Sequence, residues 1–134
     1  MSRTTIPLLA TRRQLYLALW VGWVALTFVL TSIPNPTFQV PIPAADKLEH
    51  LAFYGVMGFF FALWRRASGA SAARAVAQAL AFAVLAGCLD EVHQHWIPGR
   101  SADPLDWLAD TAGGGCGALF SALLSGRFPS LLTE

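Results

Sequence analysis

The residues of this sequence that could do chemistry are concentrated in one segment, 89–110, which reads LDEVHQHWIPGRSADPLDWLAD. It holds five carboxylates, two histidines and one arginine in a chain of which only 13% of the residues are charged. Carboxylates and imidazoles can transfer protons or ligate a divalent cation. The guanidinium of Arg100 suits a phosphate or carboxylate ligand, or a salt bridge within the protein. Which of these roles is possible depends on the helices and loops that position the side chains.

Helix capping accounts for some of the acids. Asp103 and Asp106 have the spacing of an N-cap and the third residue of a helix, and Pro104 suits the first turn. Asp46 and Glu49 repeat this spacing earlier in the chain. Acids at a helix start satisfy free N–H groups and complement the positive end of the dipole. These four carboxylates therefore have a structural explanation beside a functional one.

Asp90, Glu91 and Asp110 lack that explanation. Asp90 and Glu91 fall at the C-terminal end of a predicted helix, where the dipole disfavours anions. Asp110 lies two turns inside the next helix, on the same face as Asp106, and an ionisable residue at such depth is costly unless it is paired or wet. Small residues that would let another helix approach continue this face: Gly113, Gly114 and Gly117.

A stripe on an earlier helix completes the set of polar residues. Asp46, Lys47, His50 and Tyr54 are close to one another in helical projection. The candidates for catalysis are His50, Asp90 and Glu91, either as a base or as a proton shuttle. A divalent metal, if it binds, would take ligands from a wider set, although no metal motif of fixed spacing is present and no other cofactor is predicted. That set is His50, Asp90, Glu91, Asp106 and Asp110.

The elements themselves are predicted from the absence of charge. Hydrophobic residues make up 55% of the chain, in four blocks that are nearly free of charge. Runs of about 20 apolar residues match a hydrocarbon core about 30 Å thick. We predict transmembrane helices at about 15–33, 48–64, 73–91 and 104–125. They would form one all-α membrane domain over 1–134, an antiparallel bundle; a soluble bundle would have few polar residues to coat it.

The basic residues predict the orientation of this bundle. Two of them, Lys47 and Arg100, fall on one side of the predicted helices and seven on the other. The bias of Lys and Arg toward the cytoplasm places both termini inside the cell and the polar site on the extracytoplasmic side of the cell membrane. Since the seven only flank helices, no nucleic-acid partner is predicted. They are Arg3, Arg12, Arg13, Arg65, Arg66, Arg74 and Arg127.

The two outer connections lead into similar helix starts. Segments 42–52, IPAADKLEHLA, and 97–109, IPGRSADPLDWLA, share Ile-Pro followed by A-D-x-L-[DE]-x-L-A. Both helices would enter the membrane in the same sense, so a duplication would be a parallel pseudo-repeat of the first and second helix hairpins. Convergence on a good helix start is the alternative.

Three motifs together resemble the VanZ-like family of membrane proteins. The family pattern has D-K-x-x-H-x-x-x-Y, then D-E-x-x-Q, a P-G-R turn followed by Ser, and D-x-x-x-N leading to glycine. The segments 46–58 and 90–114 carry this pattern, except that Asp110 stands where the family usually has Asn. The resemblance covers about 15–125 and implies a role in the cell envelope, in a family associated with resistance to the glycopeptide antibiotic teicoplanin.

With these matches the predicted ligand-binding residues are complete. They come from both outer ends of the two hairpins, and Gly99 and Ser101 enter through the resemblance. The full set is Asp46, Lys47, His50, Tyr54, Asp90, Glu91, Gln94, Gly99, Arg100, Ser101, Asp106 and Asp110.

Three functions fit this pattern. We favour an envelope protein that binds or modulates a lipid-linked precursor or a lipoglycopeptide, with the lipid bilayer as its other partner. Lys47 and Arg100 would hold the anionic group, and Tyr54, Trp96 and Trp107 would line the apolar side. The alternative is a small membrane-embedded hydrolase or transferase that acts on a lipid-linked substrate. The third interpretation is a buried ion network that only holds short helices together.

Overall fold

The computed structural model describes residues 11–34 and 45–133. Within these residues it has four α-helices, one short 3-10 helix and no strand, which confirms the all-α class and the number of helices. Each helix end lies within one turn of its predicted position. Arg3 and the first residues of the proposed repeat, 42–44, lie outside the described residues. The elements are α1 Arg12–Thr31, α2 Ala45–Ala67, α3 Ala72–Gln94, α4 Pro104–Arg127 and η1 Pro129–Leu131.

Side-chain caps define three of the helix starts. The Thr11 hydroxyl accepts from the backbone N–H of Gln14, and the Gln14 side chain accepts from that of Thr11. Ser71 caps α3, and Asp103 caps α4 by accepting from the Leu105 N–H. The predicted cap at Asp103 is therefore confirmed.

Asp46 is not the N-cap that its sequence spacing predicted. Because α2 begins at Ala45, Asp46 lies inside its first turn and not at the N-cap. The structural positions of Asp46 and Asp103 are thus not equivalent, although their sequence contexts are similar. The duplication of the two hairpins stays a prediction.

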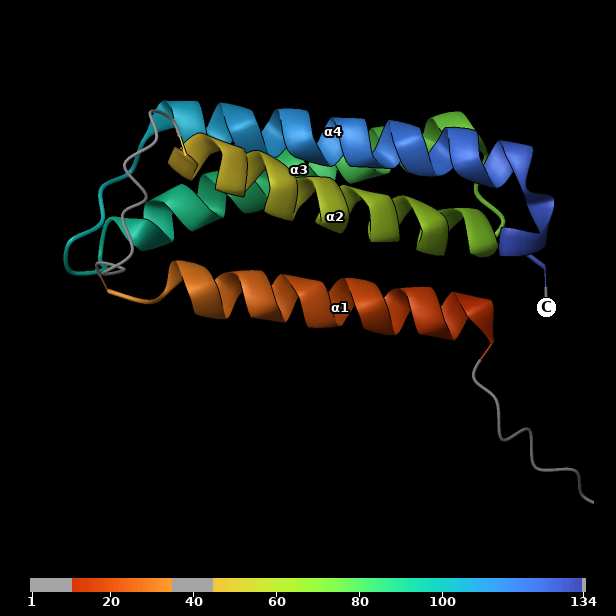
Figure 1. Ribbon diagram of the computed structural model, residues 1–134, viewed down its shortest axis with the longest axis horizontal. Helices are drawn as coiled ribbons and strands as arrows, with labels where there is room; N and C mark the ends of the chain where they lie inside the picture. The colour runs from red at the N-terminus through yellow and green to blue at the C-terminus, as the bar shows by residue number, and fades with distance from the viewer. Residues whose placement is uncertain (1–10, 35–44, 134) are drawn as a thin grey trace, which may run out of the picture.

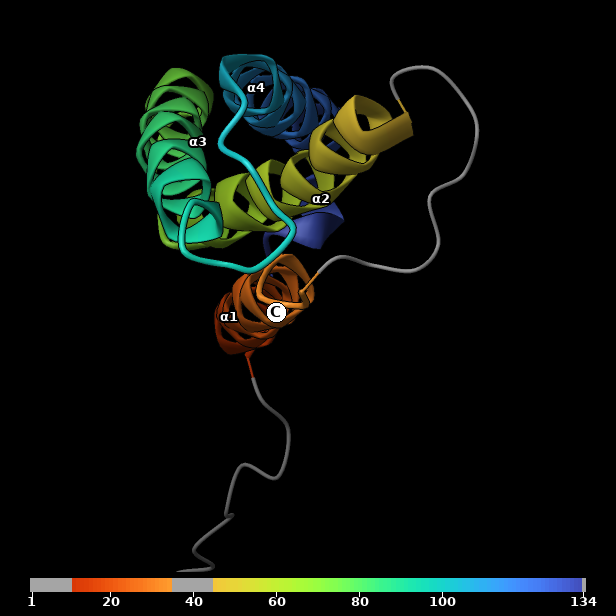
Figure 2. The ribbon, with the colours of Figure 1, turned by 90° about the vertical axis from the view of Figure 1, so that its left-hand side faces the viewer.

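The four helices alternate in direction along one long axis (Figure 1). Seen from the end, α2, α3 and α4 surround a common interior, and α1 lies against α2 on one side (Figure 2). Trp20 of α1 stacks on Trp64 with ring centroids 5.4 Å apart, and it packs in a T-shaped arrangement with Phe61 and Phe82. Trp23 also donates from its indole N–H to the Phe53 carbonyl at 2.8 Å. Aromatic packing therefore docks α1.

Glycines bring α2 and α4 into backbone contact. A Cβ atom on Gly117 would collide with the Gly55 carbonyl, and one on Gly113 with the Leu51 carbonyl. These two helices run in the same direction and share the largest interface of the described chain. The predicted packing role of the glycine face is confirmed.

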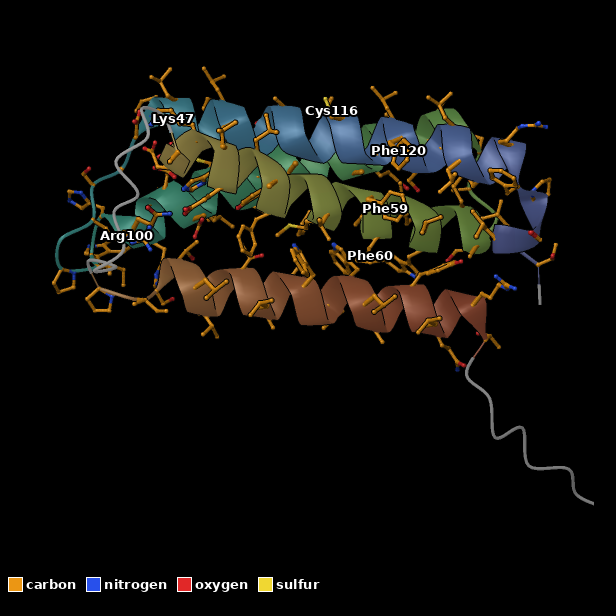
Figure 3. All side chains as sticks on the ribbon, in the orientation of Figure 1. Lys47, Phe59, Phe60, Arg100, Cys116 and Phe120 are labelled. Carbon is orange, nitrogen blue, oxygen red and sulfur yellow. The ribbon has the colours of Figure 1, made fainter. Side chains whose placement is uncertain are left out.

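The distribution of polarity is that of a membrane protein. Four carboxylates are buried, whereas large apolar side chains such as Leu85, Leu123 and Phe28 are exposed on the sides of the bundle. Lys47 and Arg100 lie toward one end, while Phe59, Phe60, Cys116 and Phe120 lie along the side (Figure 3). Cys88 and Cys116 are free and exposed. By length and composition, α1 and α3 are candidate membrane spans.

The close α2–α4 contact can be tested with two alanine substitutions in one helix. Gly117→Ala should lower the free energy of unfolding by about 1–3 kcal/mol, because its methyl group has no room. Gly126→Ala is the matched control, since a Cβ there meets nothing within 4 Å. It should be neutral or slightly stabilising through helix propensity. Thermal unfolding of purified protein in detergent measures both, and equal stabilities would contradict the contact.

Candidate functional site

One end of the bundle gathers nearly all the buried charge. This polar end is formed by the start of α2, the end of α3 and the start of α4. Four carboxylates there are buried although the surrounding helices are apolar: Asp90, Glu91, Asp106 and Asp110.

An ion cluster surrounds Lys47 in the first turn of α2. Its ammonium lies 2.9 Å from an oxygen of Asp46, 2.8 Å from Asp103 and 2.9 Å from Asp106. Lysine has three N–H donors, so these carboxylates use all of them. The hydrogen bond from Lys47 holds the pKa of Asp46 and of Asp103 below the usual value, and the three carboxylates, Asp103 first, raise the pKa of Lys47. The cluster links α2 to α4.

A second polar group lies one turn deeper, between α2 and α4. His50 Nδ1 is 2.9 Å from Oδ1 of Asp110, which is fully buried. His50 Nε2 lies 4.0 Å from an Asp106 oxygen. Gly87 of α3 makes room for this pair, because a Cβ on Gly87 would lie 2.9 Å from Oδ2 of Asp110. The carboxylate therefore orients the imidazole ring.

Glu91 completes this group from α3. Its Oε2 accepts from the backbone N–H of Asp103 at 2.6 Å, at the start of α4. Ligand atoms of His50, Glu91 and Asp110 all lie within 4.8 Å of one another, which is a grouping that could hold a metal ion. Asp46, Asp103 and Asp106 form a second such group, but the Lys47 ammonium lies among them. We call His50, Glu91 and Asp110 the triad.

Asp90 points elsewhere. Consecutive residues project about 100° apart around a helix, so Asp90 and Glu91 cannot both face α4. Asp90 accepts from the Gln94 side chain at 3.3 Å, and it lines a cavity toward α1 together with Tyr54 and His93. Of the two carboxylates predicted as bases, only Glu91 joins His50.

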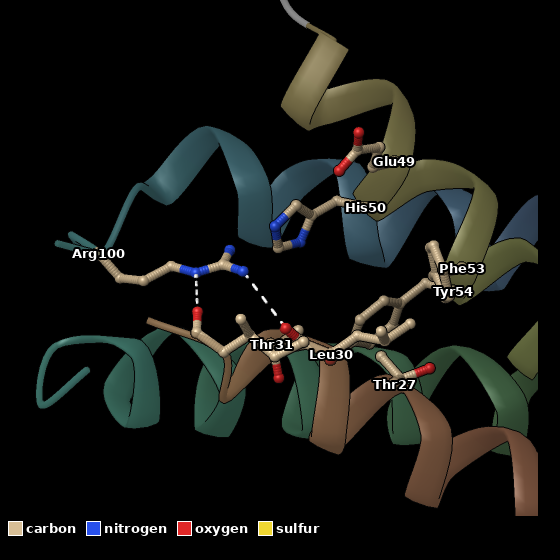
Figure 4. Close-up of a pocket in the computed structure, with 9 residues that line it drawn as sticks. Thr27, Leu30, Thr31, Glu49, His50, Phe53, Tyr54 and Arg100 are labelled. Atoms are coloured by element: carbon tan, nitrogen blue, oxygen red, sulfur yellow. Dashed lines mark hydrogen bonds between the residues drawn. The ribbon is translucent and has the colours of Figure 1, made fainter. Parts of the chain in front are cut away.

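A cavity of about 390 Å³ lies between α1, α2 and the α3–α4 loop (Figure 4). We call it the Arg100 cavity. Gly99, with φ of 80°, turns the loop so that Arg100 reaches it. Arg100 donates to the carbonyls of Leu30 at 3.3 Å and Ile33 at 3.4 Å, and no described carboxylate pairs with it. The lining residues are Thr27, Leu30, Thr31, Ile33, Glu49, His50, Phe53, Tyr54 and Arg100.

A second cavity, of about 450 Å³, lies on the other side of the triad, between α3 and α4. We call it the Glu91 cavity. Trp96 and Trp107 line this cavity with Glu91, and do not line the Arg100 cavity as the sequence suggested. Ser101 is exposed and lines neither of the two cavities.

The structure thus divides the predicted residues. His50, Tyr54 and Arg100 share one cavity, while Lys47 is held within its ion cluster and has no free donor for a ligand. The contribution of α1 to the cavity was missed. Thr27 and Thr31, one turn apart in the mainly apolar second half of α1, were the available signal.

Comparison with known proteins finds one family for the chain. The sequence model of the VanZ/LLP1 family matches residues 11–125, which include α1 to α3 and nearly all of α4. No curated protein and no solved structure matches the chain.

The ion cluster around Lys47 should make the stability of the protein depend on pH in the acid range. Lys47→Met should unfold several degrees below the wild type at neutral pH, because it leaves carboxylates without their cation. The pKa of Asp46 and Asp103 is lowered in the folded state. The stability that these two carboxylates add to the folded state is therefore complete at a pH above the ordinary Asp pKa of about 4. It is lost as the pH falls through their lowered pKa.

Thermal unfolding between about pH 7 and pH 3 measures this effect in detergent. The difference between wild type and Lys47→Met should shrink as the pH falls. Arg74→Met is the control, because Arg74 makes no ion pair with any other described residue. A difference that does not change with pH would contradict the cluster.

Proposed function

The chain belongs to the VanZ/LLP1 family, and we propose that it is a multi-pass protein of the cell membrane that binds an anionic, lipid-linked ligand at its polar end. Apolar sides and buried carboxylates support four membrane-spanning helices. Arg65, Arg66 and Arg127 end α2 and α4, at the end opposite the site. This asymmetry favours an extracytoplasmic polar end.

The Arg100 cavity is the observation that carries the proposal. Arg100 and His50 both line it, and the guanidinium has only backbone carbonyls as described partners. A phosphate or carboxylate would replace these long hydrogen bonds with charge-assisted ones. Leu30, Ile33 and Phe53 supply apolar walls for a lipid chain. A lipid-linked precursor and a lipoglycopeptide share this combination of anion and acyl or prenyl chain.

Binding of two probes tests the proposal. A polyprenyl phosphate and teicoplanin would each be titrated into the detergent-solubilised protein by isothermal titration calorimetry. Arg100→Ala should weaken binding of the true ligand class by about 10- to 100-fold, as for the loss of a charged hydrogen bond. Arg100→Lys should retain part of it, because the charge stays and the fork is lost.

Arg127→Ala is the control, because Arg127 lies in the last turn of α4, away from the polar end. Its affinity should equal that of the wild type. If Arg100→Ala binds both probes as tightly as the wild type, the assignment of this cavity is wrong.

One observation favours an enzyme as the second candidate. The His50–Asp110 pair has the form of a carboxylate-oriented imidazole that can act as a general base on a lipid-linked phosphoester. His50→Gln should then lower the hydrolysis of a polyprenyl diphosphate, measured as released phosphate, by about 100-fold or more, while binding persists. Arg127→Ala, in the last turn of α4 and away from the polar end, is the control. Equal turnover by wild type and His50→Gln would exclude this role.

A further inference from the structure

Three helices each contribute one metal-ligating side chain to the triad. His50 comes from α2, Glu91 from α3 and Asp110 from α4, and their ligand atoms lie within 4.8 Å of one another. An imidazole with two carboxylates is a donor set that suits divalent transition metals. Proximity of acids alone is common in proteins, so the argument depends on the state of the individual oxygen atoms.

Two of these oxygens are buried and unpartnered. Oε1 of Glu91 and Oδ2 of Asp110 have no hydrogen-bond partner among the described residues. Glu91 is 7% exposed and Asp110 is fully buried. A buried carboxylate oxygen that has lost water and gained no donor is strongly unfavourable, and most buried polar atoms do have partners. Both oxygens therefore require something that the described residues do not supply.

The charge around the triad leads to the same conclusion. Lys47, the single lysine of the sequence, already shares its three donors with Asp46, Asp103 and Asp106. Arg100 contacts backbone carbonyls across the cavity. Within the described chain this leaves only His50 to balance the carboxylates of Glu91 and Asp110. An uncompensated buried charge is costly, so an added cation would stabilise this arrangement.

We propose that His50, Glu91 and Asp110 bind one divalent transition-metal ion, of the Zn²⁺ or Mn²⁺ class. Three protein ligands leave a position open for an exogenous oxygen, as in metal sites that act on a substrate. Access is available from both sides, because His50 lines the Arg100 cavity and Glu91 lines the Glu91 cavity. A metal bound to His50 would occupy an imidazole lone pair, which a general base at His50 would need to accept a proton.

A metal at this position would also add positive charge to the wall of the Arg100 cavity, through His50. It would then strengthen the binding of a phosphate group there. This consequence rests on the proposed function, whereas metal binding itself does not. The two can be separated by measuring metal content and lipid affinity on the same samples.

The test uses full-length protein purified in detergent without chelator. Elemental analysis should find a stoichiometric transition metal, and after EDTA treatment Zn²⁺ or Mn²⁺ added alone should raise the unfolding temperature. Glu91→Gln and Asp110→Asn should each bind the metal at least about tenfold more weakly. Asn keeps the shape and nearly the volume of Asp, so the second variant is expected to fold. Glu49→Gln, a carboxylate outside the triad, should bind like the wild type.

Three results would overturn the proposal. The first is metal-free protein that neither ion stabilises, and the second is equal metal affinity in Asp110→Asn and wild type. The third is a Glu91→Gln variant that is more stable than wild type and on which metal has no effect. That third result would mean that protons, and not a metal ion, neutralise the carboxylates. Calorimetry with a polyprenyl phosphate gives the second readout. Metal binding without lipid binding would leave the metal site standing and reject the proposed function alone.

Discussion

The polar end depends on how closely α2 and α4 approach each other. Gly113 lies three residues after Asp110, and its backbone is against Leu51, the residue after His50. A side chain at Gly113 would separate the helices beside the place where His50 meets Asp110 at 2.9 Å. The same approach lets Lys47 of α2 reach Asp103 and Asp106 of α4. Small residues in the apolar half of the interface thus set the distances in the polar half.

The first helix has a different role from the other three. It is joined to them by aromatic rings and by single hydrogen bonds, such as that from Trp23 to Phe53. It also lines the Arg100 cavity near its C-terminal end, with Thr27, Leu30 and Thr31. The last carbonyls of a helix lack intrahelical partners, and Arg100 donates to one of them, on Leu30, and to Ile33 just beyond the helix. The cavity therefore lies between a charged three-helix unit and an apolar helix.

The sequence could predict what depends on a single helix. Runs of apolar residues located all four helices to within one turn, and spacing of four residues placed Asp106 with Asp110 and His50 with Tyr54. It could not predict contacts between helices, because these depend on how far each helix is rotated about its axis. Asp90 and Glu91 were interchangeable in the sequence, yet only Glu91 reaches the triad. Similarly, nothing in the spacing showed that carboxylates would occupy all three donors of Lys47, or that Arg100 would pair with none of the described carboxylates.

The two acidic groups at the polar end differ in how their charge is balanced. Asp46, Asp103 and Asp106 share an ammonium, and Asp46 and Asp103 are partly in contact with solvent. Their arrangement is explained by structure alone, because it caps α4 and ties it to α2. Glu91 and Asp110 lie deeper. Among the residues that the structure describes, each keeps an oxygen without a partner, and only the His50 imidazole can offset their charge. A chain that needed only rigidity would gain more from apolar side chains at these positions. The cost of keeping the carboxylates there is therefore best explained by a ligand that they bind.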